Sequence, residues 1–171
     1  MRLAINGRMA AATALAVAVA IGAALPGAFA ETAVAPTAFR DALAQTSKVQ
    51  GALQRTLVLS RVMVEPGAEL ALHHHLGTQV ARVEAGVLTY TVRSGSVTVR
   101  DGQSDEASKP VRTIRSGQTA RIAAGEWIVE QPSDIHEAAN RGAKPVVIYI
   151  ATLLKKGAPP ATPVSAASLA D

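Results

Sequence analysis

Residues 66–86 read PGAELALHHHLGTQVARVEAG, and this stretch holds three of the four histidines in the chain. In an extended strand, side chains two residues apart point to the same face, so His73 and His75 can converge on one point while His74 points away. The fourth histidine, His136, lies far along the sequence. A chain that uses histidine so sparingly, yet clusters it in this way, is typical of a metal-binding protein.

The candidate metal ligands are His73, His75, His136 and Gln79, which follows His75 by four residues. Three imidazoles and an amide oxygen suit one divalent transition metal such as Fe, Mn, Ni, Cu or Zn, and do not suit Ca or Mg. Gln79 has an alternative role, which is a hydrogen bond to a coordinated water or to a ligating imidazole. The alternative for the histidines is a polar loop and a core histidine, with no metal.

The segment 53–154 predicts a single all-β domain. Short apolar runs rich in β-branched residues recur between glycine-containing turns, and no long helical pattern interrupts them. This spacing is typical of a β-sandwich or barrel. The strands are expected at 53–65, 79–84, 87–92, 97–100, 111–115, 119–122, 126–130, 135–139 and 146–154.

Two segments of different composition flank this domain. Residues 31–52 are small, polar and alanine-rich, and are expected to form an N-terminal arm in which 38–45 favour a short helix. Residues 155–171 consist largely of Ala, Pro and Ser with little to bury, and are expected to form a disordered tail.

Residues 1–30 have the three-part pattern of a secretory signal peptide. Two arginines precede an apolar run, and Ala28-Phe29-Ala30 ends it with the small residues that signal peptidase accepts. The alternative is a membrane anchor, but the run is short for a span of roughly 20 residues. We therefore expect cleavage after Ala30, a periplasmic or secreted protein, and no membrane attachment afterwards.

Composition excludes several classes of protein. Without Arg2 and Arg8, fifteen basic residues face thirteen acidic ones, a net charge of +2. No Lys/Arg cluster with interleaved aromatics remains, so nucleic acid is not an expected partner. The chain has no cysteine, which excludes disulfides, thiolate catalysis and thiolate metal ligands.

The spacing of the site residues resembles the cupin family of small β-barrels. The first cupin motif, G-x5-H-x-H-x(3,4)-E-x6-G, is matched from Gly67 to Gly86 except at one position. The second motif, G-x5-P-x-G-x2-H-x3-N, is approximated from Gly125 to Asn140, with His136 at the motif position. The resemblance covers about 53–154 and implies a jelly-roll barrel with one metal inside.

Two positions depart from the cupin motifs. Gln79 stands where the family has glutamate, which removes an anionic ligand and is expected to weaken metal affinity and increase Lewis acidity. The proline of the second motif is shifted to Pro132, which alters the loop before His136. The resemblance also implies a small-molecule ligand or substrate and a homodimer.

The leading functional hypothesis is a small metalloenzyme of the dioxygenase-like oxidoreductase type. No carboxylate or lysine is predicted beside the ion, and this absence argues against isomerases and epimerases, which need a general base. Oxygen chemistry at a metal needs mainly open coordination positions. The alternatives are a non-catalytic module that binds a small ligand or a metal, and a stable domain with an empty site.

Overall fold

The computed structural model describes residues 35–103 and 106–169. The signal peptide expected at residues 1–30 lies outside this part of the chain. No helix within the described residues is long and apolar enough to cross a bilayer.

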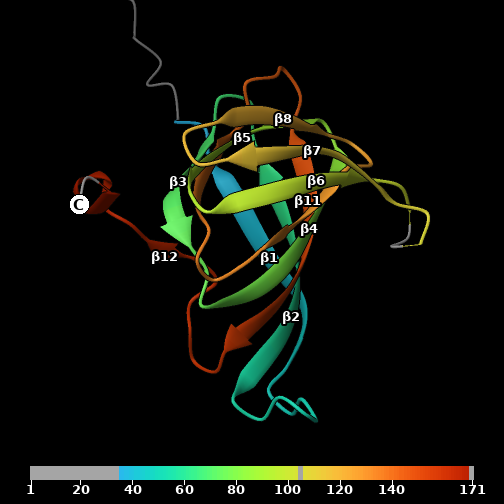
Figure 1. Ribbon diagram of the computed structural model, residues 1–171, viewed down its shortest axis with the longest axis vertical. Helices are drawn as coiled ribbons and strands as arrows, with labels where there is room; N and C mark the ends of the chain where they lie inside the picture. The colour runs from blue at the N-terminus through green and yellow to red at the C-terminus, as the bar shows by residue number, and fades with distance from the viewer. Residues whose placement is uncertain (1–34, 104–105, 170–171) are drawn as a thin grey trace, which may run out of the picture. The chain divides into compact units, whose positions relative to one another are not determined.

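Two antiparallel sheets form the domain (Figure 1). The larger sheet has the strand order β1-β2-β11-β4-β9-β6-β7, and the smaller sheet has the order β12-β3-β10-β5-β8. The bounds are β1 Ala38–Thr46, β2 Arg55–Val64, β3 Glu69–His74, β4 Gly77–Ala85, β5 Val87–Ser94, β6 Ser96–Asp101, β7 Lys109–Arg115, β8 Thr119–Ala123, β9 Trp127–Glu130, β10 Ile135–Ala139, β11 Val146–Lys155 and β12 Thr162–Pro163; a 3₁₀ turn covers Ala166–Leu169.

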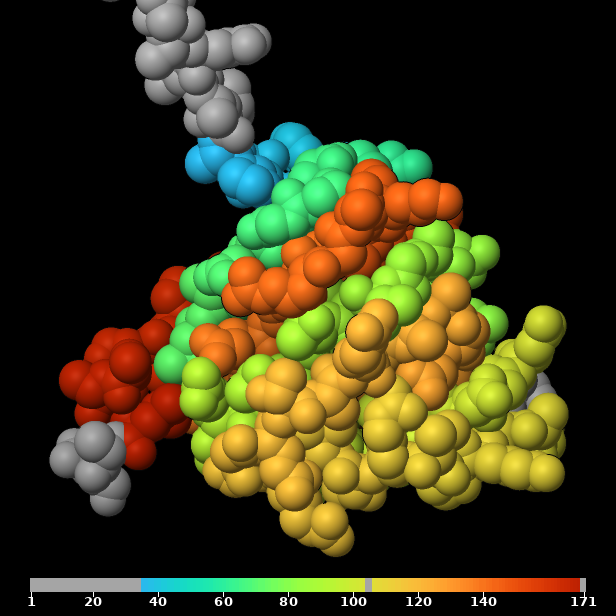
Figure 2. Space-filling model, turned by 90° about the horizontal axis from the view of Figure 1, so that it is seen from above, coloured from blue at the N-terminus to red at the C-terminus, as the bar shows by residue number. Residues whose placement is uncertain are grey.

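The strand order brings distant parts of the sequence together. Figure 2 shows β1, β2, β11 and β4 as neighbouring blue, green, orange and lime segments. Along β2 and β11, alternate side chains are buried because successive residues of a strand point to opposite faces. The inward side chains of both sheets form one apolar core, which includes Val62, Val83, Ile122, Ile128 and Ile148. The all-β prediction for 53–154 is confirmed, and its nine expected strands correspond to β2 and β4–β11.

The helix expected across residues 38–45 is wrong, because these residues belong to β1. β1 pairs with β2 in antiparallel register from Ala38↔Val64 to Thr46↔Leu57 and is the edge strand of the larger sheet. The backbone groups along the free edge of β2 bond with β1, and this tertiary pairing overrides the helical preference of an alanine-rich segment. The expected N-terminal arm therefore supplies part of the barrel wall.

The disordered tail expected at 155–171 is not what the structure shows for the described residues up to 169. β12 pairs with β3, and the Val164 amide donates to the Leu72 carbonyl at 3.0 Å. These backbone bonds hold a segment that has few apolar side chains of its own. Pairing with the free edge of β3 therefore orders the C-terminal segment, although the composition of that segment predicts disorder.

Asn140, the last residue of the second motif, fixes backbone at the end of β10. Its buried amide nitrogen donates to the carbonyls of Val64 and Lys144, both at 2.8 Å. Its amide oxygen accepts from the Gly142 backbone N–H at 2.9 Å. Asn140 thus has a structural role.

Gly77 lies where β4 passes closest to β11, and an alanine there should destabilise the fold. A Cβ at Gly77 would lie 2.1 Å from the Leu153 carbonyl oxygen, which is backbone that cannot move aside. We expect Gly77→Ala to lower the free energy of unfolding by about 3 kcal/mol, measured by urea denaturation. Gly117→Ala is the control: φ is +79° but nothing lies within 4 Å of its Cβ, so its cost should stay near 1 kcal/mol. Equal losses in the two variants would contradict this account.

Candidate functional site

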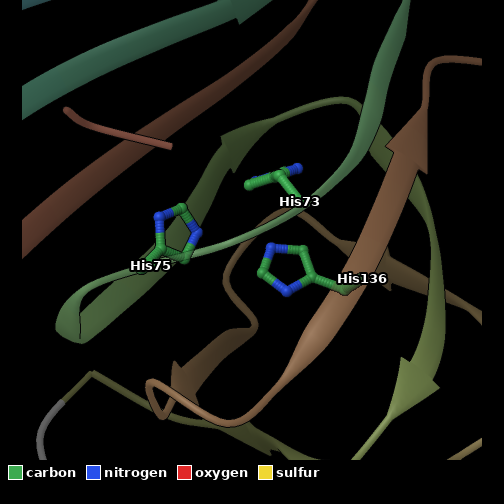
Figure 3. Close-up of side chains that lie close together, drawn as sticks. All are labelled: His73, His75 and His136. Carbon is green, nitrogen blue, oxygen red and sulfur yellow. The ribbon is translucent and has the colours of Figure 1, made fainter. Parts of the chain in front are cut away.

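Three histidines converge between the two sheets (Figure 3). His73 lies on β3, His75 directly after it, and His136 on the neighbouring strand β10 in register with His73. One nitrogen from each ring lies within 4.8 Å of the others, so this group can hold a metal ion. His75 and His136 are buried, whereas His73 is partly exposed. The convergence predicted from the i, i+2 spacing is confirmed.

A backbone carbonyl fixes the orientation of each imidazole. Nδ1 of His73 lies 2.6 Å from the Ala71 oxygen, Nδ1 of His75 lies 2.7 Å from the Pro160 oxygen, and Nδ1 of His136 lies 3.3 Å from the Asp134 oxygen. A carbonyl oxygen only accepts, so these short contacts place the proton of His73 and of His75 on Nδ1 and leave a lone pair on Nε2. Such hydrogen bonds commonly orient metal-binding histidines.

A buried carboxylate, Glu130 on β9, lies against this group. Its Oε1 is 3.2 Å from Nε2 of His136, its Oε2 is 3.6 Å from Nε2 of His75, and its side chain is 3% exposed. The hydroxyl of Tyr90 donates to Oε1 at 2.6 Å. The expectation that no carboxylate lies beside the site is therefore wrong.

The sequence contains a weak signal for Glu130. In the strand Trp127–Glu130, Ile128 and Glu130 share the inward face by alternation. What places Glu130 at the site is the pairing of β9 with β4, in which Gln79 and Glu130 are direct partners. β4 and β9 are separated by four intervening strands in the sequence, so motif spacing does not reveal this pairing.

Gln79 is buried and touches the same groups through its amide nitrogen. Nε2 of Gln79 donates to Oε2 of Glu130 and lies 2.9 Å from Nε2 of His75. Its Oε1 accepts from the Thr152 hydroxyl at 3.2 Å. Both groups that face Nε2 are acceptors, which agrees with an amide N–H₂ at that position. An amide nitrogen in this orientation serves as a hydrogen-bond donor, while the oxygen that would bind a metal faces Thr152.

Burial sets the charge state of the site. Burial lowers the pKa values of His73, His75 and His136, so all three rings are neutral at pH 7. Burial by itself would raise the pKa of Glu130, but its attraction to His136 and His75, which acts when those rings are protonated, and the hydrogen bonds from Tyr90 and Gln79 leave it lowered. Burial also raises the pKa of Tyr90, which keeps its hydroxyl protonated as a donor. The site thus combines three neutral imidazoles with one carboxylate.

The site opens into a small apolar cavity of about 260 Å³. Its walls come from both sheets and from both flanking segments, since Ala38 and Arg40 of β1 and Pro163 of β12 contribute. Tyr90, whose ring stacks on His136 with centroids 5.1 Å apart, closes one side. Most of the lining is aliphatic, including Val62, Leu70, Leu88, Ile122, Ile128 and Ile148. His73, His136 and Glu130 therefore border a cavity suited to a small, largely apolar molecule.

No protein-family model and no curated protein matches the chain significantly. Among solved structures, a cupin 2 domain-containing protein from Halorhodospira halophila matches with 16% identity and a TM-score of 0.51, covering 78% of this chain and 74% of that one. The polyketide cyclase RemF from Streptomyces resistomycificus matches with 15% identity and a TM-score of 0.49, covering 75% and 71%. A cupin-like protein from Thermotoga maritima matches with 18% identity and a TM-score of 0.48, covering 75% and 76%.

The similarity to the Halorhodospira halophila structure and the two-sheet architecture confirm the cupin fold that the two motifs predict. At 16% identity this similarity establishes the fold and leaves the reaction open. The function has to be argued from the site.

The contact between His75 and Pro160 makes the C-terminal segment part of the site, and its removal should weaken metal binding. A chain truncated after Lys156 lacks the Pro160 carbonyl that orients the His75 ring. We expect roughly a 10- to 100-fold loss of Zn²⁺ affinity, measured by competition with a chromogenic chelator. Truncation after Val164 is the control, because it retains Pro160 and β12, and it should bind Zn²⁺ as the full chain does. Wild-type affinity in the shorter chain would show that Pro160 does not position His75.

Proposed function

We propose that this protein is a metal-dependent enzyme that acts on a small, largely apolar molecule. One observation carries the proposal: both ring nitrogens of His136 face oxygen acceptors in a buried site, Nδ1 the Asp134 carbonyl at 3.3 Å and Nε2 a carboxylate oxygen of Glu130 at 3.2 Å, whereas a neutral imidazole has one N–H to donate. Two lone pairs at this distance repel each other unless a cation or a proton lies beside both. A divalent cation held by the three imidazoles and Glu130 would satisfy all of these groups.

The distances fit neighbouring ligands of one ion. Nitrogen and oxygen ligands at 2.0–2.2 Å from a transition metal, separated by 90–109°, lie about 2.8–3.6 Å apart. Oε1 of Glu130 lies 3.2 Å from Nε2 of His136, and Oε2 of Glu130 lies 3.6 Å from Nε2 of His75; both distances fall within this range. His73, His75, His136 and Glu130 would hold the metal, and Gln79 would hydrogen-bond Glu130.

The reaction we favour is a dioxygenase-like oxidation. A bound transition metal would supply Lewis acidity and open coordination positions. The apolar cavity would exclude bulk water and hold the substrate beside the histidines. Tyr90 and Gln79 would keep the Glu130 carboxylate fixed as an anion by donating to it.

Glu130 also favours a second reaction class, namely proton transfer to and from the substrate. A buried carboxylate beside a small-molecule cavity has the chemistry of a general base. Oxygen uptake distinguishes the first class, and solvent deuterium incorporation into the substrate distinguishes the second. A non-catalytic binding module, the remaining alternative, would show neither.

The signal-peptide pattern of residues 1–30 supports the further proposal that the protein works in the periplasm or outside the cell. The homodimer expected from the cupin resemblance also remains a proposal. Exposed apolar side chains on the outer face of the larger sheet, including Leu57, Leu59, Val80 and Tyr149, are compatible with it.

Metal content tests the proposed function directly. We expect about one equivalent of a divalent transition metal per chain in protein purified without a histidine tag, measured by elemental analysis. His75→Ala should abolish it by removing a ligand. His74→Ala is the matched control, since His74 is not part of the convergent group, and it should retain the metal. Protein that stays metal-free after incubation with Fe²⁺, Mn²⁺, Cu²⁺ and Zn²⁺ would refute the proposed function.

An exchange of side chains between β4 and β9 tests the role of Glu130. Glu130→Gln should lower metal affinity roughly 10- to 100-fold, because it removes the anionic ligand. The double variant Gln79→Glu/Glu130→Gln returns the carboxylate to the neighbouring strand and should recover most of the loss. Calorimetric titration of metal into the two variants measures this recovery. If the double variant binds no better than Glu130→Gln, a carboxylate on β4 does not replace Glu130.

A further inference from the structure

Arg40 of β1 borders the cavity at the histidine site. In register with Val62, which is 3% exposed, Arg40 lies on the inner face of the larger sheet. Its guanidinium contacts the Ser60 hydroxyl at 3.4 Å. Among the described residues, no carboxylate lies within ion-pair distance of Arg40.

Arg40 also lies close to the candidate metal site. The cavity that Arg40 borders is also lined by His73, His136 and Glu130. A small molecule in that cavity can therefore reach the guanidinium and the histidine site at once.

A second hollow, whose lining mixes polar and apolar side chains, meets the apolar cavity at Arg40. It has a volume of about 710 Å³, and its lining includes Gln45, Thr56, Ser60, Thr152 and Lys156. Of the described residues that line the two hollows, Arg40 alone borders both. An anionic group placed at Arg40 would thus have a cation and polar side chains around it, while an attached apolar body would face the aliphatic walls.

We propose that the ligand of this site is a small monocarboxylate whose carboxylate binds Arg40 and whose apolar part lies in the cavity beside the histidines. This proposal rests on the proposed function, because it names the substrate class of the same site. A planar guanidinium matches a carboxylate with two parallel hydrogen bonds. The aliphatic lining and small volume of the inner cavity exclude a large or strongly polar body.

Paired probes separate this proposal from general affinity for the cavity. Butyrate, hexanoate, benzoate and phenylacetate are each compared with the primary amide of the same skeleton, by calorimetry or ligand-observed NMR. Titrations use both metal-free and metal-loaded full-length protein. In the metal-free protein we expect at least one carboxylate to bind roughly 10-fold or more tightly than its amide, because a charge-assisted hydrogen bond is lost in the amide.

Arg40→Gln and Arg61→Gln, two variants with the same net charge, identify Arg40 as the source of that preference. Arg40→Gln should reduce the ratio of carboxylate to amide affinity to near one, and Arg40→Lys should retain part of it. Arg61→Gln is the control, because Arg61 is on the outer face of β2 and pairs with Asp41, and it should keep the wild-type ratio. The proposal is overturned if no carboxylate binds better than its amide, if nothing binds at all, or if the preference survives in Arg40→Gln.

Metal content separates a failure of this ligand proposal from a failure of the proposed function. Metal content is measured on the same samples and should not change in Arg40→Gln, since Arg40 is not a ligand. A protein that prefers carboxylates but holds no metal would support the ligand assignment and refute the metalloenzyme. A protein that holds metal but shows no such preference would support the metalloenzyme and refute the ligand assignment.

Discussion

The buried carboxylate of Glu130 is the constraint on which the interior of this protein depends. A carboxylate that is 3% exposed between two apolar sheets is costly unless every lone pair has a partner. Tyr90 and Gln79 donate to it, and the Nε2 atoms of His75 and His136 face it from the other side. The donors Tyr90 and Gln79 leave the imidazole nitrogens facing the carboxylate with no positive charge between them. A cation between the carboxylate and the imidazoles explains this arrangement best.

The N-terminal and C-terminal segments of the domain each add a strand to one of the two sheets. β1 extends the larger sheet and brings Arg40 to the cavity, while the C-terminal segment extends the smaller sheet and brings the Pro160 carbonyl to His75. Both segments have weak sequence signals and are held by backbone hydrogen bonds to strand edges. The orientation of the His75 ring and the lining of the cavity thus depend on residues outside the motifs.

The sequence predicts the strands and the histidines because each depends on local periodicity. Alternation defines β2 and β11, and the i, i+2 spacing places His73 and His75 on one face. Glu130 is not predicted, because its position depends on the pairing of β4 with β9, which no local pattern contains. The strand character of β1 is missed for the same reason: the alanine-rich segment pairs along the free edge of β2.

The most direct test of this account is a crystal structure of the protein loaded with Zn²⁺, with anomalous diffraction data collected at the zinc edge. The account predicts one anomalous peak per chain, about 2.0–2.1 Å from Nε2 of His73, His75 and His136 and about 2.0–2.2 Å from a Glu130 oxygen. A peak bound elsewhere, or no peak between the two sheets, would contradict it. In that case the buried carboxylate would be balanced by a proton, and the cavity would belong to a binding protein.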